Sequence, residues 1–228
     1  KATAVLGSLL YATSYGLIVY SRWFSHPPLI IPFSILMFWS LARAAIKEKF
    51  YILFLLSWGA IFHLDLVDAV FFIPSIIVYF YWQKPAIPSK RIVLVCLLLF
   101  LLTFLPYVIF DFRHQFLMLN SLKKFLILSN SFEVPDIWGA VSHIYFRYTS
   151  EIQDVLASNF FYLPVAIFIF SLIWIFLKRK KSPGEKLVLL WVISLPTLAI
   201  IIAPAFGLKH YLVGLSAGMA LLTSLWLT

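Results

Sequence analysis

The chain has 228 residues, of which 63% are hydrophobic and 12% are charged, and its formal net charge is +9. This composition lies far outside that of soluble globular domains and predicts an integral membrane protein. Most of the positive charge lies in short segments between apolar stretches, where Lys and Arg orient helices and meet lipid headgroups, so nucleic-acid binding is not expected. The single cysteine, Cys96, excludes an intrachain disulfide and a cysteine pair for a metal.

The chain begins at Lys1 without an initiator Met and runs directly into apolar residues, so we interpret it as a piece of a longer protein. A membrane span needs about 20 apolar residues. Such segments are predicted near residues 2–20, 29–46, 92–110, 159–177, 187–204 and 210–228.

The apolar stretch at 50–82 is too long for a single crossing, because a helix rises about 1.5 Å per residue. Lys47 and Lys49 precede this stretch and Lys84, Lys90 and Arg91 follow it, so both of its ends are expected on the same, cytoplasmic side. A hairpin of two short helices that turns between residues 63 and 68 meets this requirement. The expected fold is therefore all-α, a polytopic bundle of about eight transmembrane helices with both termini in the cytoplasm.

This threading separates the charges between the two membrane faces. The basic loops, which the positive-inside rule places in the cytoplasm, carry twelve of the 18 Lys and Arg residues: Lys1, Arg43, Lys47, Lys49, Lys84, Lys90, Arg91, Lys178, Arg179, Lys180, Lys181 and Lys186. The opposite face receives all five histidines and most of the acids: His26, His63, His114, His143, His210, Asp65, Asp68, Asp111, Glu133, Asp136, Glu151 and Asp154. Ionisable groups beside lipid indicate function more often than packing.

Three parts of the chain follow from this topology. Residues 1–110 form the first five spans, including the hairpin at 50–82; residues 111–158 lie outside the membrane; and residues 159–228 form the last three spans. Within the outward part, the spacing of apolar residues over 137–157 predicts a helix on the membrane surface, with a polar stripe of His143, Arg147, Glu151 and Asp154. A second interfacial helix is predicted over 116–126, around Lys123 and Lys124.

The hairpin carries the first candidate site, with His63, Asp65 and Asp68 within six residues at its outer end. Each side chain would cost several kcal/mol if it were left unpaired beside lipid, so each needs protein, water, metal or substrate as a partner. The two carboxylates could hold a divalent cation through oxygen ligands. The alternative is that these residues solvate an exposed turn or cap the second short helix, since Asp is a favoured N-cap.

The second candidate site follows the span that ends in Leu105-Pro-Tyr107, where Asp111, Arg113 and His114 enter the outer interface together. Arg113 and His114 could bind a phosphate, because the planar guanidinium bonds two phosphate oxygens at once. A local Asp111–Arg113 pair that anchors a helix end is the alternative.

Two further cationic positions face outward. Lys209, His210 and Tyr211 open the final span, where an ordinary interfacial anchor would have the same composition. Arg22 lies in Tyr20-Ser-Arg-Trp-Phe-Ser-His-Pro-Pro28 and is interpreted as structural by default, although it is retained as a binding candidate. The chain has no glycine-rich phosphate loop, zinc-spaced Cys or His pair, or nucleophile elbow.

Four segments give the chain a family resemblance: Tyr20-Ser-Arg22, Gly59-Ala-Ile-Phe-His-Leu64, Leu105-Pro-Tyr-Val-Ile-Phe-Asp-Phe-Arg-His114 and Lys209-His-Tyr-Leu212. With these segments the chain resembles the later part of a membrane glycosyltransferase of the GT-C superfamily, which includes protein O-mannosyltransferases and aminoarabinose transferases. The resemblance covers most of the chain, and the third segment is the most specific.

The resemblance implies transfer of a sugar from a polyprenyl-phosphate donor, which enters laterally between helices, to a lipid, glycan or protein acceptor at the outer face of a bacterial or archaeal plasma membrane. It implies that Arg113, His114, Lys209 and His210 bind the lipid phosphate, with His63, Asp111, Tyr211 and Arg22 nearby. Asp65 and Asp68 are then the candidate carboxylates for deprotonating the acceptor. The Asp-Glu type motif that such families carry in their first outward loop is absent, so the principal catalytic acid is expected upstream of Lys1.

Three other functions remain open at this point. A transporter or flippase for a lipid-linked sugar would also use outward cations and intramembrane acids, but it generally needs charged groups near the bilayer midplane. A cell-surface polysaccharide polymerase or ligase would also have many spans and a long outward loop with Arg and His. A membrane scaffold without turnover is the third alternative.

Overall fold

In the computed structural model, the described residues are 2–14, 18–19, 22, 27–129, 142, 149–150, 152–153, 162–202 and 216–227. Every element within these ranges is a helix, as the sequence predicts. The elements are α1 (Ala2–Thr13), α3 (Pro27–Ala44), α4 (Phe50–Leu64), α5 (Leu66–Phe71), α6 (Ile73–Gln83), α7 (Lys90–Arg113), α8 (Leu117–Ser129), α10 (Tyr162–Leu177), α11 (Pro183–Ile202) and α12 (Ser216–Leu227).

One helix in the described part, α7, is long and apolar enough by length and composition to cross a bilayer. Its 24 residues correspond to about 36 Å at 1.5 Å per residue. Shorter apolar helical stretches of 10–17 residues lie in α1, α3, α4, α5–α6, α10 and α12. α1 ends at Thr13, whereas the predicted span continues to residue 20. The helix lengths therefore do not confirm a bundle of eight spans.

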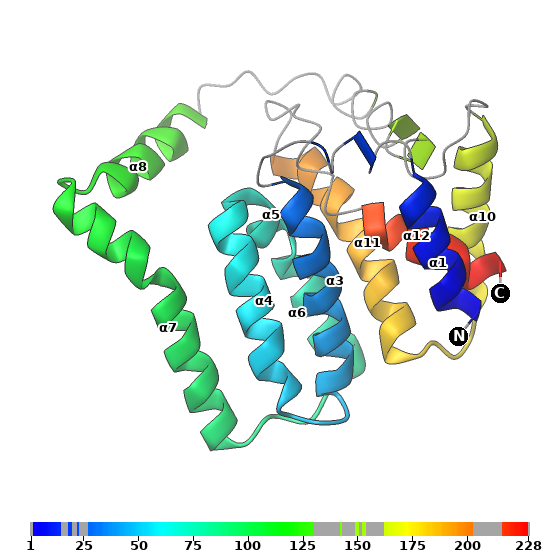
Figure 1. The fold of residues 1–228 in the computed structure, drawn as a ribbon, viewed down its shortest axis with the longest axis horizontal. Coiled ribbons are helices and arrows are strands. Elements are labelled where there is room, and N and C mark those ends of the chain that lie inside the picture. The colour runs from blue at the N-terminus through cyan, green and yellow to red at the C-terminus, as the bar shows by residue number, and fades with distance from the viewer. Residues whose placement is uncertain are drawn as a thin grey trace.

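The long apolar stretch after residue 50 is divided into three helices. α4 ends at Leu64, Asp65 is extended (φ −153°, ψ 113°), and α5 and α6 follow. The indole Nε1–H of Trp58 donates to the carbonyl of Ala69 at 3.0 Å and holds α5 against α4. The hydroxyl of Tyr51 donates to the carbonyl of Ala86 at 3.3 Å, so the start of α4 lies beside the end of α6. The chain therefore reverses its direction between α4 and α6, as Figure 1 shows.

The buried core joins this hairpin to α3 and α11. The ring of Phe38 on α3 stacks on Trp191 of α11, with centroids 4.6 Å apart, and meets the edge of Phe72 at 5.3 Å. The hydroxyl of Ser75 on α6 donates to the carbonyl of Leu190 at 3.1 Å. These contacts place α3, α6 and α11 around one core, with α1, α10 and α12 grouped beside α11 (Figure 1).

α7 lies at the edge of the bundle, beside α4 (Figure 1). No residue of its apolar window is buried, and leucines such as Leu98 and Leu102 are more than half exposed. An apolar surface of this length is characteristic of contact with lipid. The helix predicted around Lys123 and Lys124 is present as α8, whereas the surface helix predicted at 137–157 lies largely outside the described residues.

Candidate functional site

The hairpin and the second half of α7 meet through a set of specific contacts. The imidazole of His63 stacks on the ring of Tyr107, with centroids 4.8 Å apart and an interplanar angle of 14°. His63 Nε2 lies 2.6 Å from the carbonyl oxygen of Thr103, and the Tyr107 hydroxyl donates to the carbonyl of Phe62 at 3.2 Å. We call His63, Thr103 and Tyr107, together with Gly59, the hairpin–α7 junction.

A glycine allows the two helices to approach this closely. A Cβ added to Gly59 would lie 2.8 Å from Cγ2 of Thr103, closer than real Cβ contacts allow. Gly59 precedes His63 by four residues, and Thr103 precedes Tyr107 by four. Each pair therefore lies on one face of its helix. Sequence reasoning missed this junction, and the matching i, i+4 spacing on two neighbouring helices was the signal that could have revealed it.

A row of aromatic rings continues the junction along the two helices. Phe62 meets the edge of Phe104 at 5.3 Å, Phe104 lies 4.7 Å from Phe100, and Trp58 lies 6.4 Å from Phe100. Aromatic pairs at such separations stabilise a packing interface beyond their buried area. The row therefore fixes the register between α4 and α7 and, with it, the position of His63.

The contacts of His63 define its proton positions. A carbonyl oxygen only accepts hydrogen bonds, so Nε2 carries the proton in the bond to Thr103. In the neutral ring, Nδ1 is then an acceptor. Because the His63 side chain is exposed, this nitrogen can accept a hydrogen bond or a proton from a bound substrate.

The two acids of the hairpin differ in their surroundings. Oδ1 of Asp65 accepts the backbone N–H of Asp68 at 3.4 Å, the N-cap to N3 contact of helix α5. Asp65 thus caps α5, which is the alternative to a functional role that the sequence left open. The side chain of Asp68 is 0% exposed, and neither carboxylate oxygen has a hydrogen-bond partner among the described residues.

Burial without a partner is costly for an ionised carboxylate, so an ionised Asp68 would need a further group beside it. Within the described ranges, no group of three His, Cys, Asp or Glu residues has a geometry that could hold a metal ion. A divalent cation at Asp65 and Asp68 would therefore need ligands from elsewhere.

Asp111 holds the elbow between α7 and α8. Its carboxylate accepts the backbone N–H groups of Met118 at 2.7 Å and Leu119 at 3.2 Å, at the start of α8. The intervening Gln115 and Phe116 have φ values of 55° and 60°, a left-handed conformation that is rare outside glycine. No ion pair joins Asp111 to Arg113 in the described part of the chain. Asp111 thus anchors a helix end, but through backbone contacts instead of the expected pair.

The cations at the end of α7 are more accessible. The ring of His114 stacks on Phe110 at 4.0 Å, and its Nδ1 lies 2.8 Å from the Phe110 carbonyl, so Nδ1 carries a proton and Nε2 is left for another group. The Arg113 side chain is exposed and has no hydrogen-bond or ion-pair partner among the described residues. An anion at the end of α7 can therefore reach both side chains.

The remaining predicted site residues are not brought to this place by the described structure. Arg22 is described and exposed, outside the helices. Lys209, His210 and Tyr211 lie outside the described residues. The structure thus unites His63 with α7 and leaves the roles of Arg22 and the Lys209 segment as predictions.

Comparison with known proteins gives one family. The sequence model of the dolichyl-phosphate-mannose-protein mannosyltransferase family matches residues 1–110, which include α1 to α6 and most of α7. Over these residues the match confirms the resemblance to GT-C glycosyltransferases. At a general level, the family implies a membrane glycosyltransferase that uses a lipid-phosphate sugar donor. No curated protein and no solved structure matches the chain significantly.

Proposed function

We propose that this chain, whose first 110 residues match the mannosyltransferase family, is part of a membrane glycosyltransferase that moves a sugar from a polyprenyl-phosphate donor to an acceptor at the outer membrane face. The observation that carries the proposal is the family match itself. The hairpin–α7 junction supports it, because it joins the matched hairpin to the helix end that bears Arg113 and His114.

In the proposed reaction, a hydroxyl of the acceptor attacks the anomeric carbon of the donor sugar. The bond between that carbon and the phosphate oxygen breaks, a base takes the hydroxyl proton, and the polyprenyl phosphate leaves with the bonding electron pair. Cations that bind the phosphate more tightly as its charge increases lower the barrier of this step. The exposed Arg113 at the end of α7 fits this role, and His114 beside it can donate a second hydrogen bond when its Nε2 also carries a proton.

The junction supplies the acceptor side of the site. Nδ1 of His63 can accept a hydrogen bond from the acceptor, and Asp65 is the half-buried carboxylate next to it. Asp68 is buried and so acts through its surroundings instead of touching the acceptor.

The proposed topology has about eight spans, with the hairpin counted as two crossings. The basic loops face the cytoplasm, and the junction and the α7–α8 elbow face outward. In Figure 1 the ends of α4 and α7 that carry the junction lie opposite the last turn of α3, which contains Arg43, and opposite the segments that follow α6 and α10.

The test is a pair of substitutions at opposite ends of α7 in the complete protein. We expect Arg113→Ala to weaken polyprenyl-phosphate binding about tenfold, since hydrogen bonds between charged groups contribute roughly 1.5–3 kcal/mol. Arg113→Lys should retain part of the affinity. The matched control, Arg91→Ala, removes a cation from the first turn of the same helix and should leave binding unchanged. Equal affinity of Arg113→Ala and the unchanged protein would contradict the proposal.

A further inference from the structure

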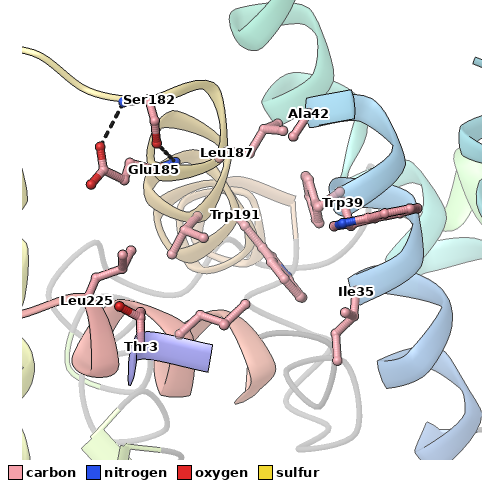
Figure 2. Close-up of a pocket in the computed structure, with 13 residues that line it drawn as sticks. Thr3, Ile35, Trp39, Ala42, Ser182, Glu185, Leu187, Trp191 and Leu225 are labelled. Atoms are coloured by element: carbon pink, nitrogen blue, oxygen red, sulfur yellow. Dashed lines mark hydrogen bonds between the residues drawn. The ribbon is translucent and has the colours of Figure 1, made fainter. Parts of the chain in front are cut away.

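A cleft opens between α1, α3, α11 and α12, in a part of the molecule that the proposed reaction does not use. It has a volume of about 370 Å³. Its walls are predominantly apolar and include Ile35, Trp39, Trp191 and Leu225 (Figure 2). α3 runs from the junction side of the bundle at Pro27 to the basic side at Ala44, and Trp39 and Ala42 line the cleft near that basic end. The cleft is therefore separate from the hairpin–α7 junction.

Glu185 lies at one end of the cleft lining, which we call its mouth, and its charge is neutralised by Lys178. Ser182, Gly184 and Glu185 form this end of the lining. Glu185 accepts the Ser182 N–H at 2.7 Å, as Figure 2 shows, and the ammonium of Lys178 at 2.6 Å. The carboxylate thus adds no net negative charge to the mouth.

Three cations lie next to lining residues at this end of the cleft, either in space or along the chain. The guanidinium of Arg43 lies over the ring of Trp39, 5.8 Å from its centroid. Arg179 and Lys180 lie in the loop that leads to Ser182. Both are exposed and have no ion-pair partner among the described residues. The cleft therefore combines an apolar interior with an excess of positive charge at its rim.

We propose that this cleft binds an anionic phospholipid, with one acyl chain against Trp39 and Trp191 and the headgroup phosphate beside Arg43 and the Arg179–Lys180 loop. The charge complementarity carries the choice of ligand, because basic pockets between membrane helices favour anionic headgroups. Pockets of roughly 300–1,000 Å³ are the usual size for small-molecule ligands. This lipid has a structural or regulatory role and is distinct from the proposed sugar donor, which the outward cations would bind.

The experiment is native mass spectrometry of the full chain in detergent, titrated with phosphatidylglycerol or phosphatidylcholine of identical acyl chains. We expect a single phosphatidylglycerol adduct at about tenfold lower lipid concentration than the phosphatidylcholine adduct. A phosphatidylglycerol with a diazirine on its acyl chain should crosslink to peptides of α3 and α11 that contain Trp39 and Trp191. Equal binding of the two lipids, or crosslinks confined to other helices, would overturn the proposal.

Three variants separate the parts of the proposed site. Gly184→Leu should weaken the binding of both lipids about tenfold by filling the cleft, and the Cβ that it adds meets no atom within 4 Å. Arg43→Gln should remove most of the preference for phosphatidylglycerol. Arg91→Gln, a cation on the same basic side at the start of α7, should change neither affinity. Unaltered binding by both Gly184→Leu and Arg43→Gln would refute the site, and Arg113→Ala should leave it intact whatever its effect on the donor.

Discussion

Gly59 is the residue on which the contact between α4 and α7 depends most directly. A methyl group at this position would lie 2.8 Å from Cγ2 of Thr103, so the contact leaves no space for it. The Thr103 carbonyl also accepts a hydrogen bond from His63 Nε2–H. The packing of one glycine is thus linked to the orientation of the imidazole.

Gly59→Ala should therefore destabilise the protein by about 1–3 kcal/mol, the usual cost of overpacking a tight contact. Thermal unfolding in detergent measures the effect. Gly184→Ala is the matched control, since its Cβ meets nothing within 4 Å. The double variant Gly59→Ala/Thr103→Ala should recover much of the loss, because it removes the clashing methyl group. Because alanine favours a helix more than glycine does, a similar loss in the two single glycine variants would show that the contact with Thr103 is not responsible.

Glu185 gives the stability a defined pH dependence. It precedes the apolar part of α11, outside the predicted span. Burial raises its pKa, but the hydrogen bonds from Lys178 and Ser182 and the Lys178 charge outweigh burial and leave the pKa below its ordinary value. Because the folded state then binds the proton less tightly than the unfolded chain, the contribution of Glu185 is complete above the unfolded-state pKa and is lost as the pH falls through the folded-state pKa.

The unfolding temperature of the unchanged protein should consequently fall more between pH 7 and about pH 3 than that of Glu185→Gln, because the loss begins only below the unfolded-state pKa. The glutamine cannot ionise, so it lacks the ion pair with Lys178 at every pH and loses nothing on acidification. Differential scanning fluorimetry across this range gives the comparison. Parallel curves for the two proteins would mean that the Lys178–Glu185 pair does not stabilise the fold.

At the scale of the element, the orientation of α8 depends on a carboxylate outside the helix. Asp111 accepts two N–H groups of the first turn of α8, which also places a negative charge at the positive end of the helix dipole. The consecutive left-handed residues Gln115 and Phe116 are held by this contact. The elbow is thus a strained turn fixed from α7.

Asp111→Asn should weaken the start of α8 by about 0.5–2 kcal/mol, as the loss of a cap does. Hydrogen exchange at the amides of Met118 and Leu119 should accelerate severalfold, whereas exchange in α4 should not change. Arg113→Gln is the control, because it alters the charge of the elbow and retains the cap. Unchanged protection in Asp111→Asn would assign the stability of the elbow to other contacts.

The sequence predicts several helices well but misses the hairpin–α7 junction. Helix boundaries depend on residues close together in the chain, whereas the junction joins residues far apart in it. The break at Asp65 follows from local information, namely apolar length and an acid that can cap the next helix. The meeting of His63 with Tyr107 joins residues 44 positions apart, and only a glycine opposite a threonine permits it. The sequence predicts Asp68 as a candidate site residue, but its complete burial depends on the packing of α5 against its neighbours, which no local pattern encodes.

At the scale of the whole molecule, the charge separation predicts which loops share a membrane face. With Cys96→Ala as background, Lys49→Cys, Ile87→Cys and Lys180→Cys should react with an impermeant maleimide only after the membrane is permeabilised. Arg113→Cys should react in intact cells. Labelling of Lys49→Cys and Ile87→Cys on opposite faces would mean that the hairpin does not return, and the proposed count of spans would be wrong.

The helix lengths explain why the number of spans could be predicted only loosely. A basic loop indicates the side on which a segment ends, but it does not indicate how far the intervening helix extends. α4, α6 and α7 are all apolar, so composition alone predicts each of them as a membrane crossing. In the structure, however, α4 and α6 are shorter than α7. The charge pattern therefore constrains orientation more strongly than it constrains helix length.

The two ends of α7 are both tied to the same neighbouring segment. At the basic end, Glu48 accepts the backbone N–H of Ser89 at 2.6 Å and its hydroxyl at 3.0 Å, directly before α7 begins. At the other end, His63 and Tyr107 make the second tie. Between them lies a helix with no buried residue in its apolar window. α7 is thus attached near both of its ends to the segment that runs from Glu48 to His63, so a tilt of α7 at Ser89 would also displace Tyr107 relative to His63.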